Sequence, residues 1–355
     1  MTSIRPLERT LAENVDWNKA RINFLAKFII ALIQVRSVNL TEIASVFPGR
    51  AKEESHYKRI QRFLRFFEIS YAVIAVLLVS LCGVPRPWVL TLDRSNWQLG
   101  KTPLNILVLG LVYKGVAIPV LWTILEKKGN SNTAERKAIL AEFIALFGVN
   151  SILYLCADRE FIGKTWFQWL KANHISFRIR VRENTQMTNG RGQVVAARRL
   201  FRQQAINQPL RFEKARLIWG LELFVTGMRL EGGEYLIVIA PEYGEQALRD
   251  YAKRWEIETL FGCLKSRGFR LEETHVIEPE RLKKLIALLA LAFCWAHVVG
   301  EWLSQQKPLK SKKHGRLAKS IFRYGLNHLR RILCNLAEHS QQIAFRQVTQ
   351  LLSCT

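Results

Sequence analysis

The first 85 residues place apolar side chains at the three- and four-residue spacing of amphipathic helices. Helical periodicity runs from 17 to 35 and again through LTEIASVF at 40–47, which ends before a Pro-Gly pair. A third segment with this period follows at 52–67. Because apolar residues that recur at i, i+3 and i+4 share one helix face, these segments predict a helical N-terminal region over residues 1–85.

The third of these segments mixes positive charges with its apolar positions. Four cations lie on it: Lys58, Arg59, Arg62 and Arg65. Two helices around a Pro-Gly turn, the second of them basic, resemble a helix-turn-helix DNA reader. A helix face that is merely solvated would carry the same charges, so both interpretations stay open.

From residue 86 to 184 the pattern changes to that of strands alternating with helices. The Pro-Arg-Pro run at 85–87 ends the helical period. The following segments predict strand, strand, strand, helix, strand, helix and strand: 88–95, 104–115, 116–125, 131–147, 151–161, 161–173 and 175–183. This is the order of a ribonuclease H-like core, so the predicted fold class is α/β with such a catalytic core.

Residues 185–242 interrupt this core. They contain NGRGQ, a turn signal, and an EGG triplet between β-rich runs that predicts a β-hairpin. We therefore expect a β-rich insertion, after which the core resumes over 243–303 with helices at 244–267 and 281–303. Residues 304–355 predict a basic, helical C-terminal region.

Two apolar runs, at 72–84 and 285–300, could be mistaken for membrane spans. They are 13 and 16 residues long, shorter than the roughly 20 residues that cross a bilayer, so we expect buried helices and no membrane partner. The six cysteines form no CxxC pair and no zinc spacing, which is typical of reduced core cysteines. The N-terminus lacks the apolar core of a signal peptide, and a cytoplasmic location is therefore expected.

The chain is strongly basic, with 53 Lys and Arg against 29 Asp and Glu, and its net charge is +24. Residues 171–229 hold 12 cations against 3 acids and residues 301–355 hold 10 against 2, whereas 230–300 holds 9 against 11. Such an excess repels itself unless a polyanion offsets it. The charge favours a nucleic acid held along an extended track and disfavours an enzyme of small neutral metabolites.

Two aspartates stand at informative positions of the predicted strands. Asp93 lies on the first strand and Asp158 ends the fourth, so adjacent parallel strands could bring them together. Enzymes that cut or join phosphodiesters use converging carboxylates to hold two divalent ions about 4 Å apart. Hard oxygen ligands suit Mg²⁺. The sequence therefore predicts a site for two divalent metal ions, Mg²⁺ with Mn²⁺ as an alternative, completed by an acid from a later helix.

Residues 251–265 offer two acids for this third position. On a continuous helix of about 100° per residue, Glu258 shares a stripe about 60° wide with Tyr251, Arg254 and Lys265. Glu256 falls on the far side from that stripe. The helical wheel therefore selects Glu258, beside two cations that could bind phosphate.

This combination resembles a known family. The spacing Tyr251-x2-Arg254-x3-Glu258-x6-Lys265 looks like the Tyr-Arg-Glu-Lys signature of bacterial insertion-sequence DDE transposases. Three further blocks are similar to that family's motifs: LTLDRSNW, LCADREF and YKGVAIPVLW. The resemblance covers about residues 88–268. It implies a ribonuclease H-like core, interrupted by a β-rich insertion, in which the three acids hold two metal ions and are the catalytic residues: Asp93, Asp158 and Glu258.

The same resemblance implies an activity and partners. Water would hydrolyse the ends of a mobile element at its terminal inverted repeats, and the freed 3′-OH would attack target DNA. The partners would be double-stranded DNA and a second copy of the chain in the synaptic complex, in a bacterial cytoplasm beside the nucleoid. An insertion-domain tryptophan stabilises a flipped end base in well-known relatives, and Trp219 is the candidate here. The expected DNA-binding residues are Tyr251, Arg254, Lys265, Trp219, Lys58, Arg59, Arg62 and Arg65.

Two other functions stay open at this stage. A ribonuclease H-like nuclease that never joins strands would need the same carboxylates, and a strand-transfer assay separates it from a transposase. A catalytically silent derivative that only binds DNA is disfavoured by three acids in order, and would be revived if Mg²⁺ did not bind.

Overall fold

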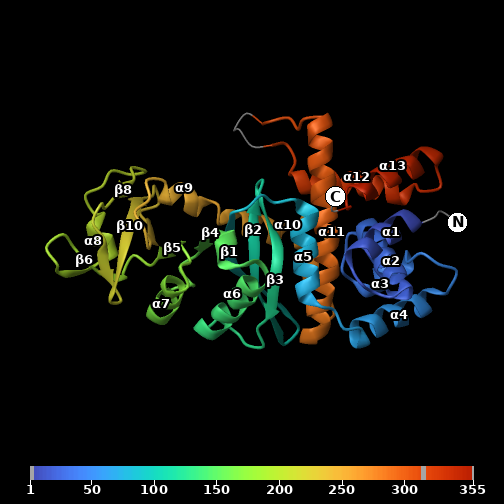
Figure 1. Ribbon diagram of the computed structural model, residues 1–355, viewed down its shortest axis with the longest axis horizontal. Helices are drawn as coiled ribbons and strands as arrows, with labels where there is room; N and C mark the ends of the chain where they lie inside the picture. Colours follow the sequence, from blue (N-terminus) through green and yellow to red (C-terminus); the bar gives the residue numbers. More distant parts are fainter. Residues whose placement is uncertain (1–3, 313–316, 354–355) are drawn as a thin grey trace.

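The computed structural model describes residues 4–312 and 317–353, and it is elongated, with a β-rich end and a helical end (Figure 1). A twisted sheet lies between them. Five of its strands lie side by side in the order β3, β2, β1, β4 and β5. Their bounds are β1 (Trp88–Leu99), β2 (Thr102–Tyr113), β3 (Val116–Ile124), β4 (Ile152–Ala157) and β5 (Phe177–Val181).

The connections match the predicted order of strands and helices. β1, β2 and β3 form an antiparallel meander, whereas β4 runs parallel to β1 and β5 runs parallel to β4. The parallel connections pass through α6 (Thr133–Phe147) and α7 (Lys164–Ala172). Helical crossovers of this kind are what parallel strands require. The mixed α/β fold with a ribonuclease H-like core is therefore confirmed.

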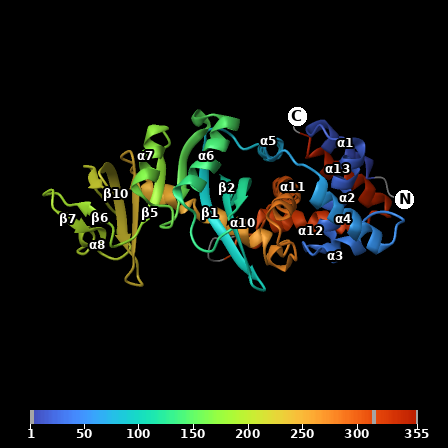
Figure 2. The same cartoon turned by 90° about the horizontal axis from the view of Figure 1, so that it is seen from below.

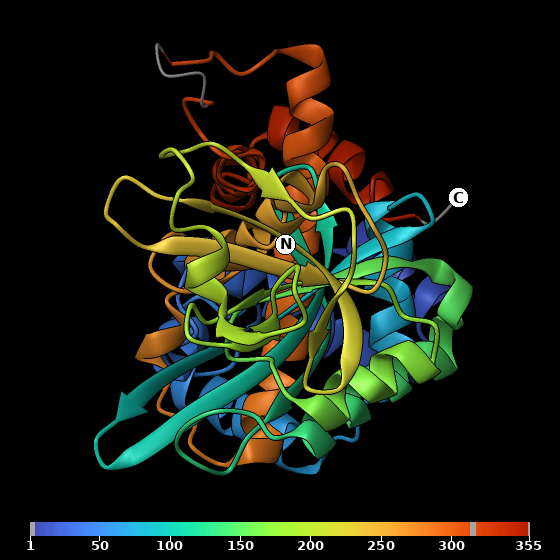
Figure 3. The same ribbon diagram turned by 90° about the vertical axis from the view of Figure 1, so that its left-hand side faces the viewer.

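One predicted boundary inside the core is wrong. The first strand was expected to end in a polar turn near residue 95, but β1 continues to Leu99 and pairs with β2 up to the Leu99↔Thr102 contact. Antiparallel pairing across the hairpin satisfies the backbone of these polar residues, which the alternation pattern alone does not reveal. The hairpin projects beyond the sheet when the β-rich end faces the viewer (Figure 3).

The β-rich segment after β5 extends the same sheet. β10 (Leu221–Arg229) and β11 (Tyr235–Ala240) form a hairpin around the EGG triplet, as predicted, and β11 pairs with β5. β8 (Leu210–Arg211) and β9 (Arg216–Ile218) pair with β10. Only β6 (Gln186–Thr188) and β7 (Val194–Ala196) form a sheet of their own, followed by the short helix α8 (Ala197–Leu200).

Helices from both ends of the chain gather at the helical end (Figures 1 and 2). The C-terminal helices α12 (Ile321–Cys334) and α13 (His339–Gln350) contact α2 and α1, respectively. The N-terminal helices are α1 (Arg5–Asn14), α2 (Lys19–Val35), α3 (Leu40–Ser45), α4 (Glu53–Phe66) and α5 (Tyr71–Cys82). Side chains of Asn18, Asn39 and Ser70 cap α2, α3 and α5. Part of the predicted C-terminal basic region, residues 313–316, lies outside the described residues.

The long helix α11 (Pro279–Gln306) joins the two ends. It has 28 residues, more than the apolar run at 285–300 indicated, and by length and composition it could cross a membrane. However, 83% of its apolar window is buried inside the protein, against α2, α5, α12 and β3. This burial is that of a core helix. Cysteines 82, 156, 263 and 294 are buried free thiols and Cys334 is an exposed one, while Cys354 lies outside the described residues.

Candidate active site

The sheet places the two predicted aspartates next to each other. β1 and β4 are parallel neighbours whose last paired residues are Leu92 and Ala157. Asp93 follows Leu92 within β1 and Asp158 follows Ala157 directly after β4, so the pairing of these strands places the two residues next to each other. The backbone N–H of Glu160 donates a 2.8 Å hydrogen bond to Oδ1 of Asp158, which holds the loop after β4 in a tight turn.

Asp93 carries the most strongly perturbed carboxyl of the predicted site. The pKa of Asp93 is raised to about 7, chiefly by burial and also by the charges of Asp158 and Glu160, although the backbone N–H of Arg94 and the guanidinium of Arg254 lower it. A buried carboxylate beside a second one favours a bound cation or a bound proton. This electrostatic setting is that of a cation-binding site.

Arg254 links Asp93 to the third predicted acid. Its Nη1 lies 3.3 Å from Oδ2 of Asp93, and its Nη2 lies 2.6 Å from Oε1 of Glu258. The Arg254 side chain is 7% exposed, whereas that of Glu258 is 43% exposed. The three acids predicted from the sequence therefore converge from β1, from the end of β4 and from α10 (Trp255–Leu264), with one guanidinium between two of them.

This arrangement does not form a finished metal cage. Within residues 4–312 and 317–353, no group of three or more His, Cys, Asp or Glu side chains is close enough to hold a metal ion. Arg254 supplies the positive charge between Asp93 and Glu258. A metal ion bound by these acids would therefore require Arg254 to move away from at least one of them.

The helix that carries Glu258 is not continuous, contrary to the helical wheel. α9 (Ala247–Ala252) ends before Arg254, and α10 starts at Trp255. The backbone N–H groups of Lys253 and Arg254 bond three residues back, to Asp250 and Tyr251, so the chain tightens there. The predicted common stripe is therefore correct for Arg254 and Glu258, which are four residues apart within α10 and its cap.

The other two residues of the predicted stripe lie outside α10: Tyr251 lies in α9, and Lys265 caps the C-terminus of α10. Tyr251 is 3% exposed, and the Arg254 guanidinium lies 5.8 Å from its ring, so Tyr251 packs beside Arg254 in the interior. Lys265 ends α10, pairs with Glu272 at 2.8 Å and lies 5.4 Å from the ring of Trp97 on β1. In this structure Tyr251 is not a surface residue, while the Lys265 ammonium is tied to an acid.

A second polar network lies beside the two aspartates and was not predicted from the sequence. Arg94 makes a two-pronged contact with Glu160, at 2.6 and 2.8 Å, and donates a 2.9 Å bond to Asn105 of β2. Arg94 follows Asp93 directly, and Glu160 lies two residues after Asp158. The signal was present in the DRS and DRE triplets, where an arginine or a glutamate accompanies each aspartate.

Glu256, the acid that the wheel rejected, has a separate role. The pKa of Glu256 is raised to about 7 by burial, which outweighs the opposing effect of backbone groups of Tyr113, Gly115 and Val116 near the carboxylate. These residues form the β2–β3 turn within the YKG motif. Glu256 therefore fastens α10 to this turn, which sets the position of Glu258 two residues later.

Trp255 is the large side chain most accessible beside the carboxylates. It is 57% exposed, and the Arg254 guanidinium lies 4.6 Å from its ring. Exposed tryptophans offer a flat apolar face on which a base can stack. Trp255 was not predicted as a site residue from the sequence, although it directly follows Arg254 of the Tyr-Arg-Glu-Lys spacing.

Trp219 occupies the two-residue turn between β9 and β10. Its φ is +50° and that of Gly220 is +78°, the left-handed pair of a tight hairpin turn. Its ring stacks on Phe167 of α7 at 5.5 Å. The side chain is half-buried and one face of its ring is occupied, so its predicted contact with a flipped base stays a prediction.

The basic helix predicted at 52–67 forms as α4 but lies at the helical end, far from the carboxylates in Figure 1. Lys58, Arg62 and Arg65 are exposed, whereas Arg59 lies over the ring of Phe24 at 5.7 Å. α3 precedes α4, so the pair predicted around the Pro-Gly turn is present. These cations therefore form a basic surface on α4 that is separate from the carboxylate site.

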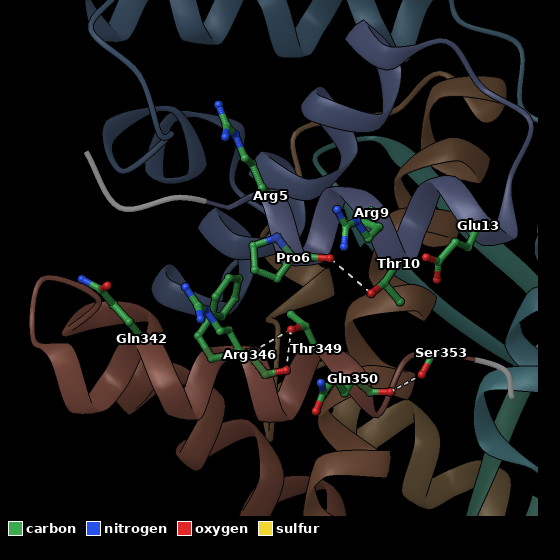
Figure 4. Close-up of a pocket in the computed structure, with 11 residues that line it drawn as sticks. Arg5, Pro6, Arg9, Thr10, Glu13, Gln342, Arg346, Thr349, Gln350 and Ser353 are labelled. Atoms are coloured by element: carbon green, nitrogen blue, oxygen red, sulfur yellow. Dashed lines mark hydrogen bonds between the residues drawn. The ribbon is translucent and has the colours of Figure 1, made fainter.

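A groove at the same end lies between α1 and α13 (Figure 4). Arg5, Arg9 and Arg346 line it together with Glu13. None of the three predicted catalytic acids lines it, so it does not belong to the site described above.

The fold and the converging acids define the class of protein: a ribonuclease H-like domain with a carboxylate site. The family comparison makes this definition more specific, because residues 119–295 match the model described as "Transposase DDE domain". The match contains Asp158 and Glu258 and begins after Asp93. Residues 119–295 therefore resemble a transposase DDE domain, and no curated protein matches the chain.

Among solved structures, the chain is similar to the piggyBac transposase in "Cryo-EM structure of piggyBac transposase synaptic complex with hairpin DNA (SNHP)". The TM-score is 0.50 at 10% sequence identity, with 93% of this chain and 72% of that chain covered. At this identity the likeness concerns the fold. The domain match and the shared fold together support a DDE transposase.

Proposed function

We propose that this protein is a DNA transposase that cuts a mobile element at its terminal inverted repeats and joins the freed 3′-OH ends to target DNA. Two observations carry this proposal: Arg254 contacts both Asp93 and Glu258, and the β1–β4 pairing places Asp158 beside Asp93, in a chain whose residues 119–295 match a transposase DDE domain. Water breaks the phosphodiester bond at the element's end and leaves a 3′-OH. That hydroxyl then attacks a phosphodiester of the target, and a target 3′-oxygen leaves.

The three acids fit divalent metal ions by their donor chemistry. Carboxylate oxygens are the ligands that Mg²⁺ and Mn²⁺ prefer, and the charge of Asp158 that raises the pKa of Asp93 marks a surplus of negative charge. Asp93, Asp158 and Glu258 would hold two such ions. When bound, the ions would activate the attacking oxygen and stabilise the leaving one.

Arg254 is proposed to change partners when DNA arrives. A phosphate accepts the two-pronged hydrogen bonds of a guanidinium as well as a carboxylate does. Arg254 would then leave Asp93 or Glu258 and hold the backbone near the reacting bond, while Tyr251 keeps its position. Lys265 is proposed to bind a neighbouring phosphate.

The surfaces on either side of the site are proposed to grip the rest of the DNA. Trp255 offers its exposed ring to a base, and Trp219 is the second aromatic candidate. At the helical end Lys58, Arg62 and Arg65 would contact backbone phosphates of the element's end, with Arg59 beside them. Because two ends must be joined in one event, we expect two copies of the chain in the DNA complex.

The test is cleavage of a duplex that carries the DNA flanking the coding region. We expect cutting that requires Mg²⁺ or Mn²⁺ and that is lost in Glu258→Gln, which keeps size and removes charge. Binding to the uncut duplex should persist. The matched control is Glu273→Gln, an exposed acid that pairs with Arg270 at 3.5 Å. Unchanged cutting by Glu258→Gln would overturn the assignment of the site.

A further inference from the structure

The hairpin of β6 and β7 carries a tip that the proposed chemistry does not use. The two strands pair with each other from Gln186↔Ala196 to Thr188↔Val194, apart from the main sheet. Residues 189–193, with the sequence NGRGQ, connect them. In Figures 1 and 2 the hairpin lies at the β-rich end, opposite the helical end.

The tip is held in one conformation by Asn189. Its side-chain Oδ1 accepts hydrogen bonds from the backbone N–H groups of Arg191 and Gln193, at 2.9 and 3.0 Å. Its Nδ2 donates a 2.9 Å bond to Oε1 of Gln193. Backbone bonds between residues 189, 192 and 193 close the turn. The tip is therefore pre-ordered, and binding through it would cost little conformational entropy.

Arg191 lies between two glycines at the tip and is the one long side chain of this Gly-Arg-Gly stretch. Gly190 and Gly192 flank it, and a Cβ added at either would meet nothing within 4 Å. Gly192 has a φ of +79°, which favours glycine. Arg191 itself is exposed, and no ion pair joins it to an acid within residues 4–312 and 317–353. The tip is thus a slim finger with one free guanidinium at its end.

The base of the finger is anchored firmly. Met187 is 1% exposed, and the backbone N–H of Leu217 on β9 donates a 2.9 Å bond to Oγ1 of Thr188. The hairpin is therefore fixed to the β9–β10 hairpin that carries Trp219. This part of the chain, residues 171–229, has four cations for each acid, so its field attracts a polyanion.

We propose that this finger enters the minor groove of duplex DNA and that Arg191 reads its width. The minor groove is about 6 Å wide, and narrow A-tract grooves concentrate negative potential that attracts arginine. Glycines on both sides let the backbone approach the groove walls. A phosphate contact would need neither the bare flanks nor specifically a guanidinium, because lysine also binds phosphate as a point charge. The inference rests on the proposed function, since it takes DNA as the partner.

The test measures binding of the full chain to two labelled duplexes of about 40 base pairs, roughly four helical turns. One duplex carries a central A-tract and the other carries G·C pairs in its place. Four variants are compared with the unchanged protein. Arg191→Ala removes the guanidinium, Arg191→Lys keeps the charge, Gly190→Leu thickens the tip, and Lys101→Ala removes an exposed cation from the turn of the β1–β2 hairpin.

We expect Arg191→Ala to lose about tenfold in affinity for the A-tract duplex, the order found for one groove-reading arginine, and much less for the other duplex. Arg191→Lys and Gly190→Leu should show most of the same selective loss, although both leave the total charge unchanged. Netropsin, which fills A-tract minor grooves, should weaken the unchanged protein and leave Arg191→Ala unaffected.

Three results would overturn the inference. If Arg191→Ala and Lys101→Ala weaken both duplexes equally, the finger supplies charge alone. If Arg191→Ala binds like the unchanged protein, the finger does not reach DNA, and the proposed transposase activity is untouched. If the unchanged protein binds neither duplex, the finger does not read A-tracts, whereas the proposed function, which concerns the element's own ends, is decided by the cleavage assay.

Discussion

Charged side chains of the carboxylate site pair around a buried guanidinium, whereas most of those on α4 at the helical end are exposed. At the site, Arg254 is buried and pairs with the partly buried Asp93, and Glu258 shares the same guanidinium. On α4 of the helical end, Lys58, Arg62 and Arg65 stay in solvent. A buried charge is tolerated only when it is paired, whereas an exposed one costs little and gains little. Substitution at the site should therefore alter chemistry and stability together, and substitution on α4 should alter only DNA binding.

The largest expected effect is on catalysis. Asp93→Asn should slow cleavage of the end duplex by about 10³-fold or more, because several kcal/mol of charge stabilisation are lost at about tenfold in rate for each 1.4 kcal/mol. Single-turnover cleavage rates measure it. An Arg62→Ala variant measured beside it should cleave at the normal rate once the enzyme is saturated with DNA. Equal loss in both would remove the distinction between the two regions.

The next effect is on folding. Arg254→Ala should lower the free energy of unfolding by about 3 kcal/mol, since it leaves a buried carboxylate without its partner. Urea denaturation measures this, and Arg254→Lys should recover part of the loss. Arg62→Ala should change the same quantity by less than about 0.5 kcal/mol. A stable Arg254→Ala variant would mean that the buried pairing contributes nothing.

A third prediction concerns the buried histidine of α11. His297 is 1% exposed, and neither ring nitrogen has a hydrogen-bond partner among residues 4–312 and 317–353. Burial lowers its pKa to about 4. The unfolded chain binds the proton more tightly, so this contribution to stability is complete above about pH 6.5 and is lost as the pH falls toward 4. The total is roughly 3 kcal/mol, from a pKa difference of about 2.5 units.

His297→Phe should remove this dependence, because Phe fills a similar volume and has no proton to bind. Urea midpoints between about pH 4 and 7 should then depend less on pH than those of the unchanged protein. His275→Phe is the control, as it replaces an exposed histidine. A pH dependence that survives His297→Phe would show that other groups cause it.

The smallest effect is expected at Trp255. Trp255→Ala should leave stability within about 0.5 kcal/mol, as for other exposed positions, but weaken binding of the end duplex by about tenfold through loss of one stacked base. Trp255→Phe should restore most of the affinity. An unchanged affinity in Trp255→Ala would leave the exposed ring without a role in DNA binding.

Much of the fold was predictable because local patterns determine it. Alternation identified β5, and apolar runs bounded by polar residues identified the other core strands, while the parallel pairing of β1 with β4 follows from the helical crossover between them. Asp93 and Asp158 could therefore be placed together without a structure. The Tyr-Arg-Glu-Lys spacing likewise identified Glu258, since four residues separate it from Arg254 on one helix face.

The features that were missed depend on contacts between distant residues. The break between α9 and α10 places Arg254 on Asp93, 161 residues away in sequence, and no local pattern encodes that pairing. The bond of Glu256 to the β2–β3 turn and the packing of α13 on α1 are long-range in the same sense. The half-buried state of Trp219 depends on Phe167 in the same way.

The most direct test of the central claim is a strand-transfer assay. A pre-cut end duplex with a free 3′-OH is incubated with supercoiled plasmid, Mg²⁺ and either the unchanged protein or Glu258→Gln. The account predicts plasmid covalently joined to the duplex for the unchanged protein and none for the variant. Cleavage without any joined product from the unchanged protein would contradict it and identify a nuclease instead.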